Sequence, residues 1–271
     1  MKKILTIAGS DSIGGAGIQA DIKTFCALGV YGMSVITAVT AQNTMGVFDV
    51  RELDQEIIRG QIDRIFEDVE VDAVKIGMVS SSTIIETVAS SLKSWNAKNI
   101  VLDPVMISKS GYYLLKKEAI DALKENLVPL ADVVTPNIPE AEELTGMKIA
   151  TVADMKEAAK RIIDMGPKSV VVKGGHMNDD AANVSDVFYD GKAFKILSSG
   201  RIVTGNTHGT GCTYSAAIAS YLGRGFDMEQ AVKLAKKYIT EAIKNSLSLG
   251  KGAGPVGHLV ELYKKAGIRY E

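Results

Sequence analysis

The stretch ILTIAGSDSIGGAGIQADIKTFCAL occupies residues 4–28 and sets the fold class. Ile4–Ala8 is a short run of apolar and β-favouring residues, a glycine-rich loop follows it, and Gly17–Leu28 has the apolar spacing of a helix. The same order, a short strand and then a helix, recurs along the chain. This alternation is typical of βαβ units, in which helices cover both faces of a mainly parallel sheet.

The remaining elements are expected at similar intervals. Further strands are predicted at Ser34–Thr40, Ala73–Ile76, Ile100–Asp103, Val133–Thr135 and Val170–Lys173. Further helices are predicted at Asp54–Glu67, Ser82–Ser94, Lys116–Asn126, Pro139–Thr145, Val152–Met165, Cys212–Leu222 and Met228–Ser246.

Two segments depart from the alternation. In Asp186–Ile202, β-rich runs flank Asp190-Gly191, a dipeptide typical of hairpin turns, so an antiparallel edge is expected. Val47–Val50 is expected to form a small flap beside the sheet. No linker or internal repeat divides the sequence, and residues 1–271 are therefore expected to form one α/β domain.

Composition excludes several classes of protein. The 271 residues carry 31 Lys plus Arg against 32 Asp plus Glu, a formal net charge of −1, so no nucleic-acid-binding surface is expected. No apolar run approaches the roughly 18 residues of a membrane span, and the apolar start is too short for a signal peptide, so no membrane partner is expected. Two cysteines are too few for a disulfide framework, which favours a cytoplasmic protein.

The stretch NTHGTGCT, residues 206–213, leads directly into a predicted helix. Its glycines let backbone N–H groups turn inward, and the helix dipole places its positive end at the same point, which favours an anion. Two interpretations are open: an anion hole for phosphoryl transfer, or a tight loop before a helix. Cys212 favours the first, because a thiol at a helix N-terminus is expected to have a depressed pKa and to act as a base or nucleophile. Cys26 is expected to be a small core residue.

The glycine-rich loop at Gly9–Gly17 matches neither the dinucleotide fingerprint nor the phosphate-binding P-loop. It is interpreted as a loop that lets a small substrate approach the backbone. Asp21, in the helix that follows, either points into that site or complements the helix dipole.

Polar residues gather where predicted strands end, the place where open α/β sheets bind ligands. Gln42, Lys75 with Met78, and Asp103 belong to this group, and Asp103 is either a magnesium- or phosphate-facing carboxylate or part of a turn before Pro104. Asn137 and Glu140 have the spacing of a helix capping box, and equally suit a hydrated Mg²⁺. Lys173 is a candidate phosphate contact. His176 and His208 have no partner spacing typical of a hydrolase triad and are interpreted as polar loop residues.

Together these motifs resemble the hydroxymethylpyrimidine and phosphomethylpyrimidine kinases of thiamin biosynthesis, in the ribokinase-like superfamily. The matching pieces are AGSDS (8–12), GGAGIQAD (14–21), TAQNT (40–44), KIGM (75–78), LDPVM (102–106), TPN (135–137), VKGGH (172–176) and HGTGCT (208–213). The resemblance implies a three-layer α/β/α sandwich, ATP and Mg²⁺, and two successive phosphorylations: of 4-amino-5-hydroxymethyl-2-methylpyrimidine and then of its monophosphate. It also implies a homodimer, and leaves open a requirement for a monovalent cation.

The resemblance also implies a role for each matched residue. The pyrimidine would contact Gly9, Asp21, Gln42, Met78 and Val105. ATP would contact Lys109, Asn137, Lys173, Thr204 and His208; Asp103 and Glu140 would hold magnesium, with Asn137 beside them; and Gly209, Thr210, Gly211 and Cys212 would form the catalytic loop, its anion hole and its base.

Gln42 gives this resemblance a physical basis, because an amide complements a donor N–H beside a ring-nitrogen acceptor, the edge of an aminopyrimidine. The alternative is a pyridoxal or pyridoxine kinase, whose substrate lacks that amino edge. A ligand-binding regulator without turnover is a third hypothesis, disfavoured because Asp103, the glycines and Cys212 are intact. Two departures from the family pattern are Ile13, where a second serine is usual, and residues 107–111, which match only partly.

Overall fold

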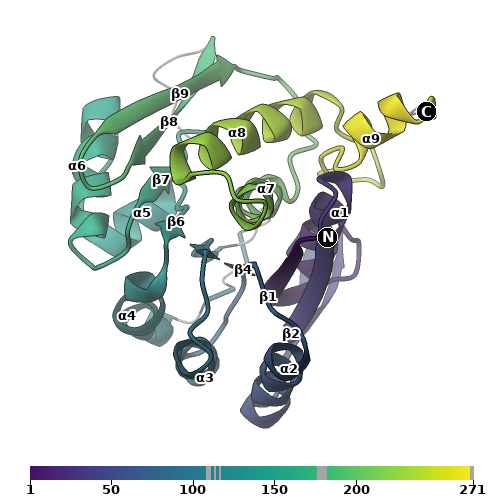
Figure 1. Cartoon of the computed structure of the whole chain (residues 1–271). Coiled ribbons are helices and arrows are strands. Elements are labelled where there is room, and N and C mark those ends of the chain that lie inside the picture. Colours follow the sequence, from purple (N-terminus) through teal and green to yellow (C-terminus); the bar gives the residue numbers. More distant parts are fainter. Residues whose placement is uncertain (108–110, 113, 116, 176–181, 269–271) are drawn as a thin grey trace.

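One nine-stranded sheet forms the centre of the computed structural model, with strand order β3-β2-β1-β4-β5-β6-β7-β8-β9 (Figure 1). The structure describes residues 1–107, 111–112, 114–115, 117–175 and 182–268. The strands are β1 (Lys3–Asp11), β2 (Tyr31–Asn43), β3 (Gly46–Glu52), β4 (Ala73–Ile76), β5 (Ile100–Leu102), β6 (Val133–Val134), β7 (Val170–Val172), β8 (Asn183–Tyr189) and β9 (Phe194–Gly200).

The six neighbouring strands β2, β1, β4, β5, β6 and β7 pair in parallel. At the two edges of the sheet, β3 and the β8–β9 hairpin pair antiparallel. The predicted hairpin is β8 and β9, which extend one edge. The predicted flap is longer than expected, since β3 pairs along the end of the thirteen-residue β2 from Ala38 to Asn43.

Helices cover both faces of the sheet. They are α1 (Gly17–Ala27), α2 (Gln55–Asp68), α3 (Ser82–Ser94), α4 (Ile120–Ala122), α5 (Ile138–Thr145), α6 (Val152–Ile163), α7 (Thr210–Gly223), α8 (Met228–Lys244) and α9 (Val260–Lys265). The predicted helix at Lys116–Asn126 is wrong as a single element. After residue 116, which lies outside the described residues, come a 3-10 turn at Lys117–Ala119, the single turn of α4, a π turn at Leu123–Leu127 and a 3-10 turn at Val128–Leu130. Pro129 within that last turn lacks the N–H that a continued helix needs.

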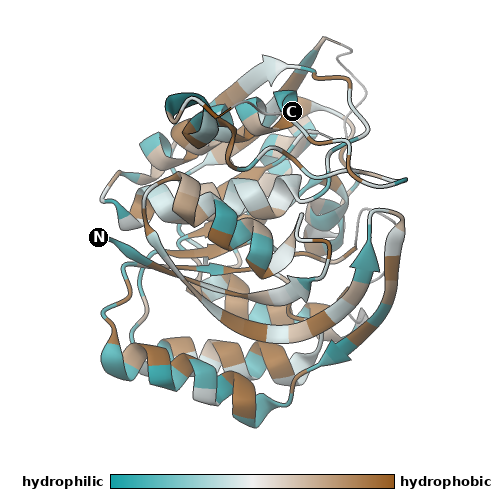
Figure 2. Cartoon of the chain, turned by 90° about the vertical axis from the view of Figure 1, so that its right-hand side faces the viewer, coloured by the Kyte–Doolittle hydropathy of each residue, from teal (hydrophilic) through white to brown (hydrophobic). Residues whose placement is uncertain are grey.

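Alternate residues of the central strands belong to two cores, because side chains along a strand point to opposite faces. Val101 of β5 joins the core that contains residues of α1, α7 and α8, whereas Ile100 and Leu102 join the core that contains residues of α2, α3, α5 and α6. Figure 2 shows the matching alternation of hydrophobic and hydrophilic residues along helices and strands. The three-layer α/β/α prediction is therefore confirmed.

This arrangement brings the ends of the parallel strands together. Helix α7 packs across β1, β4 and β5, with its N-terminus preceded by the NTHGTGCT stretch. No helix in the described ranges has both the length and the apolar character needed to cross a membrane.

Candidate active site

A cleft of about 1220 Å³ follows the carboxyl ends of the parallel strands. Fourteen of the sixteen predicted site residues line it: Gly9, Gln42, Met78, Asp103, Val105, Asn137, Glu140, Lys173, Thr204, His208, Gly209, Thr210, Gly211 and Cys212. Asp21 is not among the lining residues, and Lys109 lies outside the described residues, as does His176. Residues predicted from separate motifs thus meet at one place.

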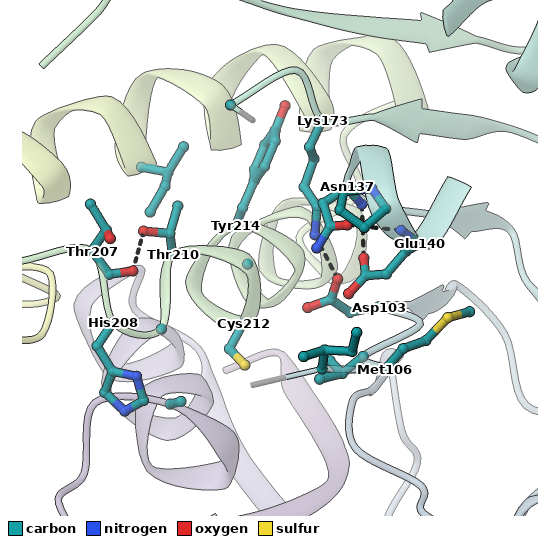
Figure 3. A pocket seen from close by; sticks show the side chains of 18 of the residues that line it. Asp103, Met106, Asn137, Glu140, Lys173, Thr207, His208, Thr210, Cys212 and Tyr214 are labelled. Atoms are coloured by element: carbon teal, nitrogen blue, oxygen red, sulfur yellow. Dashed lines mark hydrogen bonds and ion pairs between the residues drawn. The ribbon is translucent and has the colours of Figure 1, made fainter. Parts of the chain in front are cut away.

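The start of α7 forms the middle of the cleft. Gly209 precedes the helix with φ of 77°, and a Cβ there would overlap the carbonyl oxygen of Gly15, so only glycine fits where the two glycine-rich loops touch. Thr210 Oγ donates to the Thr207 carbonyl at 2.8 Å, which closes the loop onto the helix (Figure 3). The positive end of the α7 dipole therefore faces the cleft.

Cys212 points into the cleft between His208 and the Asp103–Lys173 pair (Figure 3). The prediction of a depressed thiol pKa is wrong. Burial raises the pKa of Cys212 to about 11; the ammonium of Lys75 opposes this, and the charges of Asp21 and Asp103 add to it. A thiol withdrawn from water near two carboxylates holds its proton despite the helix N-terminus.

Asp21 and Lys75 form an ion pair beneath the cleft. Lys75 Nζ lies 2.8 Å from Asp21 Oδ2, both side chains are fully buried, and Thr6 Oγ donates to the same oxygen at 2.6 Å. Burial raises the pKa of Asp21, and burial alone would lower that of Lys75, but the attraction of Asp21 outweighs it and raises the pKa of Lys75. One oxygen of the Asp21 carboxylate is thus the counter-ion of a buried lysine, while its Oδ1 has no hydrogen-bond partner within the described residues. A contact between Asp21 and the pyrimidine stays a prediction.

A second charged group lies on the other side of Cys212. Lys173 Nζ is 2.8 Å from Asp103 Oδ1, which also accepts from Thr135 Oγ at 3.1 Å. A Cβ on Gly211 would lie 3.3 Å from Lys173 Nζ and 3.4 Å from Asp103 Oδ2, so the first turn of α7 borders this pair. Burial raises the pKa of Asp103, but the attraction of Lys173 and then Lys75 outweighs it and lowers the pKa.

Asn137 and Glu140 form the capping box that their spacing predicts. Asn137 N–H donates to Glu140 Oε2 at 2.8 Å, and Glu140 N–H donates to Asn137 Oδ1 at 3.0 Å. Burial raises the pKa of Glu140 to about 7, Lys173 opposes the shift and Asp103 adds to it. Glu140 therefore caps α5 and also lines the cleft, where it lies in the same wall as Asp103 (Figure 3).

At the opposite end of the cleft, His208 contacts Asp11 rather than lying free in a loop. His208 Nε2 is 2.8 Å from Asp11 Oδ2 and 3.3 Å from Gln42 Nε2. Burial raises the pKa of Asp11, but hydrogen bonds from His208, Ala16 and Ile13 outweigh it and lower the pKa. Asp11 is therefore an ionised carboxylate at neutral pH.

A family model described as phosphomethylpyrimidine kinase matches residues 11–257 of this chain. The chain belongs to this family. It is 48% identical, over 94% of each chain, to the hydroxymethylpyrimidine/phosphomethylpyrimidine kinase of Bacillus subtilis. A solved phosphomethylpyrimidine kinase from Clostridium difficile is 55% identical with a TM-score of 0.80, covering 90% of this chain and 100% of that one. The ADP complex of Bacillus subtilis pyridoxal kinase is 44% identical with a TM-score of 0.90, covering 97% and 99%.

Sequence reasoning missed several groups of this kinase. Asp11 lies inside a quoted loop, and its position at the end of β1 was the signal that could have singled it out. Ser215 Oγ, one helical turn after Gly211, lies 3.0 Å from the Gly211 carbonyl oxygen and 3.3 Å from Asp103 Oδ2. Far along the cleft, Lys236 Nζ pairs with the buried Asp186 at 2.7 Å, and no local pattern signals that pair.

Proposed function

We propose that this kinase transfers the γ-phosphoryl group of ATP to the hydroxymethyl oxygen of 4-amino-5-hydroxymethyl-2-methylpyrimidine, and then a second one to the monophosphate, as the resemblance to the kinases of thiamin biosynthesis implies. One observation carries the proposal: the N-terminus of α7 shares a single cleft with the amide of Gln42, which lies beside His208, and with the charges of Asp103 and Lys173. The amide suits an aminopyrimidine edge, and the charges with the helix dipole suit phosphates.

In the proposed reaction the hydroxymethyl oxygen forms a bond to the γ-phosphorus while the bond to the leaving ADP breaks, and the hydroxyl proton passes to an oxygen of the transferred phosphoryl group. Lys173 and the α7 N-terminus hold the phosphates and stabilise their charge, which is most of what a loose phosphoryl-transfer state requires. Since its pKa near 11 keeps Cys212 a thiol at neutral pH, we assign it the orientation of the acceptor oxygen rather than removal of the proton. Cys212→Ala should then slow both steps by a similar factor. A larger loss in the first step would instead indicate that Cys212 removes the hydroxyl proton, because the second acceptor is already a phosphate oxygen.

The residues at this end of the cleft fit Mg²⁺, which in kinases takes one or two carboxylates together with substrate phosphates. Asp103 and Glu140 supply two buried carboxylates in the same wall, and Asn137 orients Glu140. Bound there, the ion would offset the negative charge that the phosphates carry.

The test is product analysis of the purified protein with Mg-ATP and each candidate acceptor. The aminopyrimidine should give a monophosphate and then a diphosphate. Pyridoxal and pyridoxine are the second candidates, because a pyridoxal kinase is among the similar solved structures, at 44% identity. Failure to form the pyrimidine diphosphate, with turnover of pyridoxal instead, would refute the proposal and establish the alternative.

We also propose that the protein is a homodimer that uses the β2–β3 flap. Val39, Met45 and Phe48 of this segment expose 47%, 59% and 69% of their surface, an apolar group of a kind that often marks an interface. Light scattering should give twice the 28.9 kDa chain mass, and Phe48→Ser should shift it to the monomer. A monomeric wild-type protein would contradict this.

A further inference from the structure

Gln42 lies in the cleft wall with each end of its amide beside a protein group. Its Nε2 is 3.3 Å from His208 Nε2, and its Oε1 is 3.3 Å from Thr40 Oγ. Ser12 holds the main chain, since its Oγ accepts from Gln42 N–H at 2.9 Å and donates to the Gln42 carbonyl at 2.7 Å. The choice that remains is a half-turn of the amide, which exchanges its oxygen and nitrogen without changing its shape.

At the His208 end, the number of available hydrogens does not allow the orientation in which Gln42 Nε2 faces His208 Nε2. Asp11 Oδ2 accepts from the N–H groups of Gly15 and Ala16 and lies 2.8 Å from His208 Nε2. An ionised carboxylate only accepts, so His208 Nε2 carries a hydrogen whether the ring is neutral or charged. That nitrogen cannot accept a hydrogen bond from Gln42 Nε2.

The Thr40 end shows the same conflict. Thr40 has one hydroxyl hydrogen, which it donates to the Ser10 carbonyl oxygen at 2.9 Å, so it has none for Gln42 Oε1. Its oxygen can accept instead. With the amide turned, Gln42 Nε2 donates to Thr40 Oγ. Gln42 Oε1 then lies 3.3 Å from the His208 Nε2–H group as its second, weaker acceptor after Asp11, instead of setting one donor against another.

We propose that Asp11, His208 and Thr40 are positioning residues that hold the Gln42 amide with its oxygen toward His208 and its nitrogen toward Thr40. An amide that uses one lone pair and one hydrogen on the protein keeps one of each for a ligand. The cleft then presents an acceptor on the His208 side and a donor on the Thr40 side. A 4-aminopyrimidine matches this order with its amino group and ring nitrogen, whereas the 4-oxo counterpart, with a carbonyl and a ring N–H, reverses it.

The same order directs the acceptor hydroxyl. In the substrate named above, the amino group lies between the ring nitrogen and the carbon that bears the hydroxymethyl group. An amino group on the His208 side therefore places the hydroxymethyl group further in that direction. There Gly209 to Cys212 follow His208 in the chain and form the start of α7. This inference rests on the proposed function, because it assumes a pyrimidine at Gln42.

The test compares kcat/KM for the 4-amino substrate and its 4-oxo counterpart. The wild-type enzyme should favour the amino compound by about 10- to 100-fold, the usual size of a mismatched pair of hydrogen bonds. His208→Leu and Thr40→Val each free the amide to turn, so the preference should fall about tenfold, whereas His208→Asn keeps an N–H donor and should restore part of it. Gln42→Met gives the ratio for a cleft with no amide. Equal losses on both substrates in His208→Leu would overturn the proposal.

A second readout does not depend on activity. The chain has three histidines, so the ring nitrogens of His208 can be assigned in ¹⁵N NMR spectra by comparison with His208→Asn. The proposal expects a hydrogen on Nε2, and a bare Nε2 would refute it. If the wild-type enzyme phosphorylates neither pyrimidine, the proposed function fails, while the tautomer still tests the Asp11–His208 contact on which the inferred orientation of Gln42 depends.

Discussion

The reactivity of Cys212 is the sharpest point on which the structure departs from expectation for a thiol at a helix N-terminus. Its pKa rises from the ordinary 9.0 to about 11. At pH 8 this lowers the thiolate fraction from about one in ten to about one in a thousand, so alkylation by iodoacetamide should be about 100-fold slower than for an unperturbed thiol.

The assay is alkylation of the unliganded enzyme from pH 7 to pH 10, resolved by mass spectrometry for each cysteine. Cys26 is exposed and serves as the internal control in the same sample. Because access to the cleft also slows the reagent, the slope of the rate with pH is the decisive quantity. The Cys212 rate should still rise tenfold per pH unit between pH 9 and pH 10, and Lys75→Met should move its midpoint higher, since Lys75 is the main group that lowers this pKa.

A Cys212 rate that levels off below pH 9 would refute the reasoning. It would mean that the helix dipole outweighs the burial of the thiol and the charges of Asp21 and Asp103. Cys212 would then regain the role of a proton-accepting thiolate, and the first phosphorylation should lose its dependence on pH above that midpoint.

Three further outcomes follow from the buried groups and the loop contact. Lys75→Met leaves Asp21 buried without its counter-ion and should lower the free energy of unfolding in urea by about 3–5 kcal/mol, and adding Asp21→Asn should recover part of the loss. Burial lowers the pKa of His258 from 6.5 to about 4, so as the pH falls the unfolded chain takes up a proton on this histidine before the folded chain does. The free energy of unfolding should therefore fall by about 3 kcal/mol between pH 6.5 and pH 4. His258→Phe should make this fall smaller. Gly209→Ala should lower the melting temperature and kcat together, with a stability loss of about 2 kcal/mol or more, because its Cβ would overlap Gly15; unchanged values would contradict the loop contact.

Local patterns predicted the parts of the fold that local chemistry decides. The ranges Ala73–Ile76 and Ser82–Ser94 agree with the structure at both ends, because a short apolar run and a clear helical period leave little choice. The polar residues at strand ends met as predicted, since parallel strands end at one edge of the sheet. The single helix predicted at Lys116–Asn126 was wrong, because the 3-10, α and π turns that residues 117–130 form have similar spacings of apolar residues.

Local sequence patterns could not predict contacts between residues that are far apart in the chain. Asp21 and Lys75 are 54 positions apart, and nothing near either residue indicates the other. Cys26 was wrongly placed in the core: the buried side of α1 runs through Ala20, Thr24 and Phe25, and Cys26 falls on the outer side. In the same way, the pKa of Cys212 is set by its burial, by Lys75 of β4, which lowers it, and by Asp21 of α1 and Asp103 after β5, which raise it. The sequence at the start of the helix contains none of these influences.

The sequence has nearly equal numbers of basic and acidic residues, and in the site each lysine is likewise paired with a carboxylate. In the described part of the chain, the ammonium groups of Lys75 and Lys173 lie among the carboxylates of Asp21, Asp103 and Glu140. Each ammonium group is thus offset by a neighbouring carboxylate, and the pKa of Glu140 near 7 leaves that third carboxyl group only partly ionised at neutral pH. Because Lys173 is already paired with Asp103, we expect phosphate binding to depend also on the positive end of α7 and on a divalent cation that arrives with the nucleotide. The same balance explains how a chain with a net charge of −1 can hold a highly charged substrate without a basic surface.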